Sequence, residues 1–343
     1  MDILKNPYRS VGFEHADLVE MPWTAADAAP PQALVAKCPV AGVTPLIDAQ
    51  AVATDLGIGA LHIKDERGRM GLGSFKALGA AYVIACDAAA GHAAGQTYVT
   101  ASAGNHGLSV AAGAQAFGAQ ARVYIAETVP EAFAERLRGF GADVVRKGKV
   151  YEDSMAAAAQ AAKDEDLNLL SDSSWPGYFE RPHRLMEGYL ILMAEAVAQM
   201  PQPPTHIFLQ AGVGGLAGAC AAHARLVWKD GPQIIVVEPE VAPALAASIA
   251  AGAPVVAPGP VSAMGRLDCK EPSLIALKSL ARDADTFMTI SEQEGMAGAA
   301  RADAAGFLST PSGAAGLAGL CCGAQELGLT DQARVLVILS EGA

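Results

Sequence analysis

Lys76 is the residue of this chain whose surroundings most favour covalent chemistry. It lies in the run Gly73-Ser-Phe-Lys-Ala-Leu-Gly-Ala80, between a strand pattern (residues 61–66) and an apolar helix pattern (residues 75–90). A lysine at the mouth of a sheet can form a Schiff base with a carbonyl cofactor if burial lowers its pKa. The alternative is a lysine at a helix start that extends its ammonium group into solvent. The motif alone favours that alternative.

Two further segments, each placed after a strand pattern and each opening a helix pattern, favour anion binding. They are Thr100-Ala-Ser-Ala-Gly-Asn-His-Gly107 and Gln210-Ala-Gly-Val-Gly-Gly-Leu216. Amides at the start of a helix point at an anion, and glycines allow a phosphate to approach the backbone and supply positive φ angles. Either loop alone can reflect turn geometry only. The lysine and both loops in this order make the functional interpretation much stronger.

The composition is typical of a soluble enzyme with a large core. The chain has 343 residues, of which 52% are hydrophobic, so we expect two lobes. The net charge of −12 argues against nucleic acid and an anionic membrane surface as partners. The six cysteines and seven histidines show no metal-ligand spacing, and we expect reduced thiols and no metal. The first residues, 1–7, are not typical of a signal peptide, so the expected location is the cytoplasm.

Strand and helix patterns alternate along most of the chain, which predicts an α/β fold with parallel-rich sheets covered by helices. The tight spacing within residues 96–171 predicts a small separate sheet, and Pro201-Gln-Pro-Pro204 precedes the return to a larger one. We therefore expect a discontinuous large cofactor-binding domain (residues 1–89 and 191–343) with a smaller inserted domain (residues 90–190). The predicted strands lie near residues 61–66, 96–101, 121–126, 142–147, 167–171, 206–210, 233–238, 286–290 and 334–340.

Several segments together resemble the fold-type II family of pyridoxal-phosphate enzymes, and within it the diaminopropionate ammonia-lyases most. This resemblance covers most of the chain and implies a two-lobed architecture like that of the tryptophan synthase beta chain, pyridoxal 5′-phosphate as cofactor, and a homodimer. The segments are Ser74-Phe-Lys-Ala-Leu-Gly79, Trp175-Pro-Gly-Tyr178, Met186-Glu-Gly-Tyr189, Thr205-His-Ile-Phe-Leu-Gln-Ala-Gly-Val-Gly214, Val237-Glu-Pro239 and Cys269-Lys-Glu-Pro272.

The resemblance also implies roles for individual residues. Lys76 is similar to the Schiff-base lysine, whose released amine removes the α proton, and Asn105 to the asparagine that contacts the phenolic oxygen of the cofactor. The loop that accepts the substrate carboxylate contains Ser102, Ala103, Gly104 and His106. The phosphate loop is similar to Gly212, Val213, Gly214, Gly215 and Leu216.

Three further positions either allow a second interpretation or depart from the family pattern. Ser340, at the end of a buried strand pattern, resembles the residue that faces the pyridine nitrogen. The alternative interpretation of Ser340 is a turn residue at the end of a strand. Asp172 resembles an aspartate of the ammonia-lyases that receives or holds the β-amino group, and an Asx-turn or helix cap is an equal alternative. Ala103 departs from the pattern, because the ammonia-lyases have an aspartate there that serves D-isomers.

The function expected from this resemblance is α,β-elimination from L-2,3-diaminopropionate or a similar small amino acid. The reaction gives an aminoacrylate that hydrolyses to a 2-oxo acid and ammonia. An L-serine or L-threonine dehydratase is the nearest alternative, and the alanine at position 103 increases its weight. A β-replacement synthase and a non-catalytic protein that binds pyridoxal phosphate are further alternatives.

Overall fold

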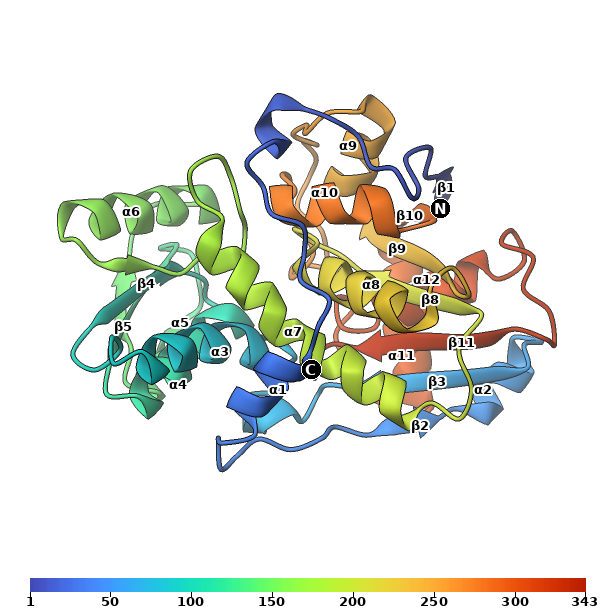
Figure 1. Cartoon of the computed structure of the whole chain (residues 1–343), viewed down its shortest axis with the longest axis horizontal. Coiled ribbons are helices and arrows are strands. Elements are labelled where there is room, and N and C mark those ends of the chain that lie inside the picture. The colour runs from blue at the N-terminus through green and yellow to red at the C-terminus, as the bar shows by residue number, and fades with distance from the viewer.

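The computed structural model describes all residues from 1 to 343, arranged around two separate sheets (Figure 1). The larger sheet contains β1 (Asp2–Lys5), β2 (Leu46–Asp48), β3 (Ala60–Asp65), β8 (His206–Gln210), β9 (Gln233–Pro239), β10 (Thr286–Ile290) and β11 (Arg334–Leu339). The smaller sheet contains β4 (Thr97–Ala101), β5 (Gln120–Ile125), β6 (Asp143–Arg146) and β7 (Asn168–Leu169).

The larger sheet has seven strands in the order β1-β10-β9-β8-β11-β3-β2. Its central strands are parallel, and only the edge strands β1 and β2 run antiparallel to their neighbours. The smaller sheet is entirely parallel, with the order β6-β5-β4-β7. The carboxyl ends of parallel strands share one edge of a sheet, which is where open α/β sheets bind ligands.

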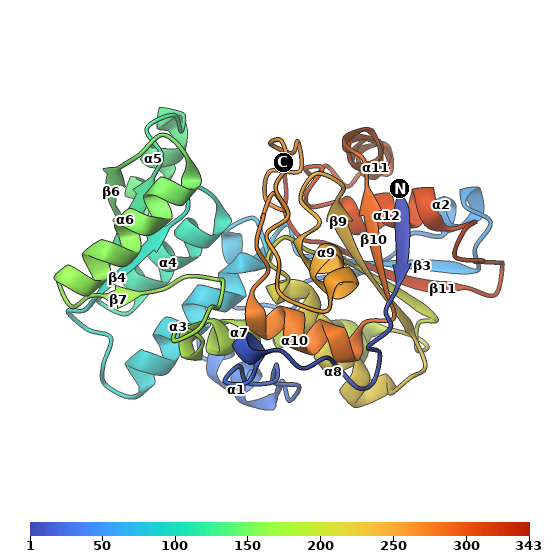
Figure 2. The same ribbon diagram turned by 90° about the horizontal axis from the view of Figure 1, so that it is seen from above.

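Helices cover both sheets. They are α1 (Ala29–Val35), α2 (Gln50–Asp55), α3 (Lys76–Ala89), α4 (Asn105–Ala116), α5 (Glu131–Gly139), α6 (Tyr151–Asp164), α7 (Glu180–Gln199), α8 (Gly215–Trp228), α9 (Ala244–Ala251), α10 (Leu274–Asp283), α11 (Glu292–Ala304) and α12 (Ala315–Gly323). Figure 2 shows α8 and α10 on one side of the larger sheet and α11 and α12 on the other.

The central strands of the larger sheet are buried on both faces because their residues alternate between two apolar clusters. Ile207 and Leu209 of β8 pack in the cluster that contains α7, α8 and α10, whereas Phe208 packs in the cluster that contains α12. Successive strand residues point to opposite faces of a sheet, so an uninterrupted apolar run is needed for a strand covered on both sides. The first cluster also includes Tyr98 and Val123 of the smaller sheet, so one continuous core joins the two sheets.

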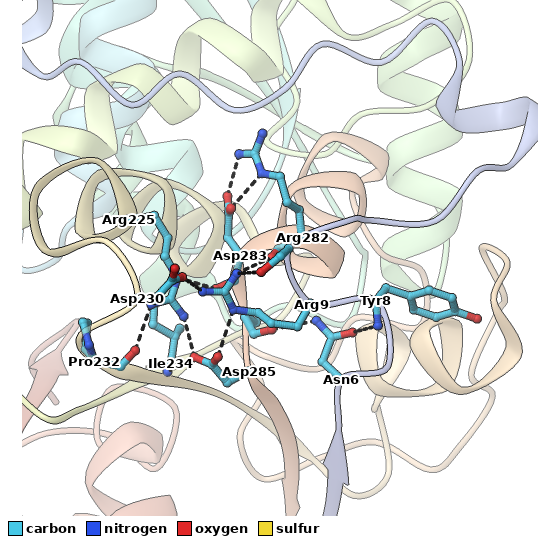
Figure 3. A network of polar contacts seen from close by, with 12 residues as sticks. Asn6, Tyr8, Arg9, Arg225, Asp230, Pro232, Ile234, Arg282, Asp283 and Asp285 are labelled. Atoms are coloured by element: carbon cyan, nitrogen blue, oxygen red, sulfur yellow. Dashed lines mark hydrogen bonds and ion pairs between the residues drawn. The ribbon is translucent and has the colours of Figure 1, made fainter.

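A polar network fastens the N-terminal segment to the larger sheet (Figure 3). Nε of Arg9 donates to Asp285 at 2.9 Å, and its Nη2 pairs with Asp230. Arg225 reaches the same Asp285 carboxylate from α8 at 2.5 Å. The side-chain amide of Asn6 donates to the carbonyl oxygens of residues 281 and 284 at the end of α10. These contacts lie away from the sequence-predicted site and have a structural role.

The predicted α/β class with parallel-rich sheets and covering helices is confirmed. All predicted strands are present, although β7 has only two residues, whereas the sequence predicted a strand over residues 167–171. Two short edge strands, β1 and β2, were not predicted. The boundaries of the two domains, near residues 90 and 190, stay a prediction. None of the helices has both the length and the apolar character needed to cross a membrane.

Candidate active site

Lys76 and Asp172 form the central ion pair of the candidate site. Lys76 is the first residue of α3, and Asp172 follows β7 of the smaller sheet; Nζ of the lysine lies 2.5 Å from Oδ2 of the aspartate. Burial works to lower the pKa of Lys76, but the Asp172 carboxylate outweighs it, so the pKa is raised. Burial works to raise the pKa of Asp172, but the Lys76 ammonium lowers it well below its usual range. The structure thus brings these two sequence-predicted residues into direct contact.

The loop of residues 102–106 connects β4 to α4. It follows the carboxyl end of β4, at the same edge of the smaller sheet as the segment after β7 that contains Asp172. The Ser102 hydroxyl accepts a hydrogen bond from the Gly104 amide at 3.2 Å, and Ala103 adds only a methyl group. The His106 ring is buried and its Nε2 lies 2.9 Å from the Leu170 carbonyl oxygen. Burial lowers the pKa of His106, which keeps the ring neutral. The contact of Nε2 helps to hold this loop, and the His106 backbone amide lies at the start of a helix, like those of the neighbouring loop residues.

Asn105 begins α4 and contacts a carboxylate that the sequence analysis did not single out. Its Nδ2 donates to Glu341, and the Thr310 hydroxyl donates to the other carboxylate oxygen of Glu341. Nε of Arg266 lies 3.6 Å from the same carboxylate, and its guanidinium also covers Gly104, where an added Cβ would lie 3.2 Å from Cζ. Glu341 is only 4% exposed. The one sequence feature that could have indicated Glu341 is its place directly after the predicted Ser340.

Ser340 lies directly after β11 and is buried. Its carbonyl oxygen accepts a hydrogen bond from the Phe75 amide at 3.0 Å, and its own amide donates to the Gly313 carbonyl oxygen. The Gly342 amide donates to the Gly73 carbonyl oxygen at 3.0 Å. The end of β11 is therefore paired with the segment that leads into Lys76, so that Ser340 lies beside the start of α3.

The glycine loop of residues 212–216 joins β8 to α8, as the sequence predicts. Gly214 has φ = 98°, a left-handed backbone conformation that residues other than glycine rarely adopt. Gly215 and Leu216 are the first two residues of the 14-residue α8. The amides at this helix start have no partner within the helix and carry partial positive charge. Val213 is held by the Ser273 amide, which donates to its carbonyl oxygen at 2.9 Å.

The residues around this site fit pyridoxal phosphate in chemistry as well as in order. The site offers an amine for the aldehyde of the cofactor and a left-handed glycine turn at a helix start for its phosphate. It also offers a hydroxyl at the end of β11. Four side chains near these elements also hold buried polar atoms that lack a hydrogen-bond partner in the protein. These side chains are Ser74, His106, Tyr189 and Gln210. Buried polar atoms are normally satisfied, so unpartnered ones gathered near one site support a polar ligand there.

Comparison with known proteins agrees with this geometry. The family described as pyridoxal-phosphate dependent enzyme matches residues 38–341. A diaminopropionate ammonia-lyase of Salmonella typhimurium is 34% identical over 284 residues, which cover 75% of this chain and 70% of that protein. A human serine dehydratase-like protein is 30% identical over 240 residues, 69% of each chain.

Among solved structures, diaminopropionate ammonia-lyase of Escherichia coli in complex with D-serine superposes with a TM-score of 0.90 and 28% identity. The superposition covers 99% of this chain and 93% of that one. The residues of the site, the match over most of the sequence and the shared architecture lead to one conclusion. This chain belongs to the family of pyridoxal-phosphate dependent enzymes, and pyridoxal phosphate is its cofactor.

Proposed function

We propose that this protein is an ammonia-lyase that removes the β-amino group of L-2,3-diaminopropionate by α,β-elimination, giving a 2-oxo acid and ammonia. The observation that carries the proposal is the contact of 2.5 Å between Nζ of Lys76 and Oδ2 of Asp172. The diaminopropionate ammonia-lyases among the relatives support the same substrate.

In this proposal the cofactor is held by residues from both sheets. Lys76 would bond its carbonyl carbon, Asn105 would contact its phenolic oxygen, and the amides of residues 212–216 would bind its phosphate. Ser340 would offer a neutral hydroxyl to the pyridine nitrogen. When bound, pyridoxal phosphate supplies an electron sink for the negative charge that develops at the α carbon of the substrate.

The substrate is oriented by its carboxylate. The loop of residues 102–106 offers the Ser102 hydroxyl and the free amides at the start of α4, a helix of 12 residues. Hydrogen bonds to these amides fix the carboxylate and so direct the α C–H bond toward Lys76.

Proton movement follows from the ionisation of Lys76 and Asp172. The Lys76 amine, released in neutral form when the substrate amine replaces it on the cofactor, would take the α proton. The β C–N bond then breaks, and the electron pair of that bond leaves with ammonia. Asp172 stays ionised, since the lysine lowers its pKa. A carboxylate that stays ionised can accept hydrogen bonds from the β-ammonium group of the substrate. It has no proton to give to a departing hydroxide, so it is a poor general acid. The enamine product then reacts with water and gives the 2-oxo acid and a second ammonia.

A dehydratase acting on L-serine or L-threonine is the second candidate, and Ala103 is the observation that favours it. The methyl group cannot act as a base, so the chain departs from the ammonia-lyase pattern at this position. In a dehydratase the departing hydroxide needs a proton, and the Lys76 ammonium would have to supply it.

A panel of amino acids tests these alternatives. Release of ammonia and 2-oxo acid is measured with L-2,3-diaminopropionate, L-serine and L-threonine, without any added nucleophile, and with Lys76→Ala as control. The highest kcat/KM for diaminopropionate supports the proposal, and the highest kcat/KM for serine or threonine supports the dehydratase. Product formation that requires a second nucleophile indicates a β-replacement synthase. Binding of cofactor without any product indicates a non-catalytic protein.

We further propose that the protein is a cytoplasmic homodimer. Its six free cysteines support a reducing compartment. The resemblance to fold-type II enzymes supports a dimer, and the N-terminal segment exposes Val11 and Val19, each 76% accessible, which could contribute to its interface. Light scattering of the purified holoenzyme measures the mass, and a monomer would contradict the dimer.

A further inference from the structure

Tyr189 of α7 carries a buried hydroxyl group that no residue of the protein satisfies. The side chain is 1% exposed, and its oxygen has no hydrogen-bond partner. Leaving a buried hydroxyl unsatisfied costs about 1–3 kcal/mol, so most such groups find a partner. A phenylalanine would fill the same space without this penalty. The hydroxyl is therefore free to accept a hydrogen bond from a donor that lies close to it.

The ring of Tyr189 is held tightly between the two segments that form the candidate site. A Cβ on Gly79 of α3 would lie 2.6 Å from Cε1, and one on Gly215 of the glycine loop would lie 3.5 Å from Cε2. The Phe75 ring meets it edge to face, with centroids 4.8 Å apart. Glycine at position 79 is therefore needed for the ring to lie here. Such a setting fixes the direction of the hydroxyl.

Lys76 is the charged group next to this ring. Its Nζ lies 5.9 Å from the ring centroid of Tyr189 and 2.5 Å from Oδ2 of Asp172. An ammonium group has three donor hydrogens, and Asp172 is the only hydrogen-bond acceptor in contact with Nζ. Burial raises the pKa of Tyr189, so the hydroxyl stays neutral and can accept a hydrogen bond.

We propose that Tyr189 is a positioning residue for Lys76. Its hydroxyl oxygen accepts a second N–H of the lysine, so that Tyr189 and Asp172 together set the direction in which Nζ points. The inference rests on the proposed role of Lys76 as the cofactor lysine. It adds a residue that acts through that lysine and touches neither substrate nor cofactor.

The experiment separates an effect on Lys76 from an effect on the cofactor phosphate. The rate at which apoprotein bonds pyridoxal phosphate is measured across pH for the parent and for Tyr189→Phe. Both apoproteins are also titrated with pyridoxine 5′-phosphate, which has the same ring and phosphate but no aldehyde. Tyr82→Phe is the matched control, because Tyr82 is a buried tyrosine on α3. Unfolding temperatures of the apoproteins are measured alongside.

We expect the rate at which Tyr189→Phe apoprotein bonds pyridoxal phosphate to rise at a pH about one to two units below that of the parent, because the hydroxyl accepts a hydrogen bond that stabilises the free ammonium of Lys76. Binding of pyridoxine phosphate and the unfolding temperature of the apoprotein should stay at the parent values, as should every property of Tyr82→Phe. Weaker binding of pyridoxine phosphate would show that the hydroxyl binds the ring or the phosphate of the cofactor and would overturn the proposal. An unshifted pH profile, or a large drop in the unfolding temperature, would also overturn it.

A Lys76→Ala arm keeps this inference separate from the proposed function. If Lys76→Ala still bonds pyridoxal phosphate covalently, the lysine itself is misassigned. If Lys76→Ala loses the covalent bond while Tyr189→Phe keeps the pH profile of the parent, only the role of Tyr189 is wrong. The substrate of the enzyme does not enter either measurement.

Discussion

Replacing Asp172 with asparagine should lower the pKa of Lys76 and move the pH dependence of the enzyme to lower pH. The Lys76 pKa lies above its usual value because the carboxylate outweighs the effect of burial. Asparagine keeps the shape of the side chain and removes its charge. Burial then acts on the ammonium without compensation, so the neutral amine becomes available at a lower pH.

The magnitude follows from the geometry of the pair. The two side chains are 22% and 19% exposed and 2.5 Å apart, so solvent screens them only in part. A hydrogen bond to a charged group contributes about 1.5–3 kcal/mol. Each pKa unit corresponds to about 1.36 kcal/mol, so the Lys76 pKa should fall by about one to two units. The rate at which the apoprotein bonds pyridoxal phosphate should therefore rise at a correspondingly lower pH.

The stability of the apoprotein should change in a defined pH window. The raised Lys76 pKa contributes stability that is present below about pH 10 and is lost at higher pH. The lowered Asp172 pKa contributes stability that is present above about pH 4 and is lost as the pH falls further. Asp172→Asn removes both contributions, so its unfolding temperature should differ most from the parent near neutral pH and converge with it in acid.

Asp268→Asn is the matched control for this prediction. Asp268 pairs with Lys270 at the same distance of 2.5 Å and with similar exposure, 15% and 22%, but neither residue is part of the proposed machinery. Its removal should leave the pH dependence of cofactor bonding at the parent position. An unshifted profile for Asp172→Asn, or an equal shift in both variants, would refute the electrostatic argument.

Three further predictions concern the loops. Gly214→Val should lose cofactor on dialysis, because Gly214 has φ = 98° and the added Cβ would lie 2.9 Å from Cβ of Ala276. Gly118 has φ = 68° and no atom within 4 Å of an added Cβ, so Gly118→Val is the control for backbone strain alone. With Ala103 in place of a base, kcat/KM for D-2,3-diaminopropionate should be about 100-fold or more below that of the L-isomer, and comparable values would reveal a second base. Glu341→Gln should lower the free energy of unfolding of the apoprotein by about 1–3 kcal/mol in urea titrations, because an amide NH2 then faces the donors of Asn105 or Thr310.

The central strands could be predicted from the sequence because they are buried on both faces and read as apolar runs between glycine-rich turns. The edge strands β1 and β2 could not. They have four and three residues, and both lie at an edge of the sheet without a continuous apolar pattern. β1 also pairs with β10, which is far away in the sequence. Their existence depends on the partner strand, which local sequence does not reveal.

The site shows the same division. Lys76, Asn105 and the glycine loop lie in local strand-to-helix motifs, so the sequence indicated them. Glu341 reaches Asn105 across 236 positions of the chain, and its role depends wholly on the way the end of β11 meets the smaller sheet. Tyr189 is conspicuous only because its oxygen lacks a partner, which is a property of packing.

The most direct test of the account is the stoichiometry of products from L-2,3-diaminopropionate. Elimination followed by hydrolysis releases two molecules of ammonia for each molecule of 2-oxo acid, because both amino groups leave. We predict this ratio for the holoenzyme with no added nucleophile, and its complete loss in Lys76→Ala. No 2-oxo acid from diaminopropionate, or the same products from Lys76→Ala, would contradict the proposed ammonia-lyase.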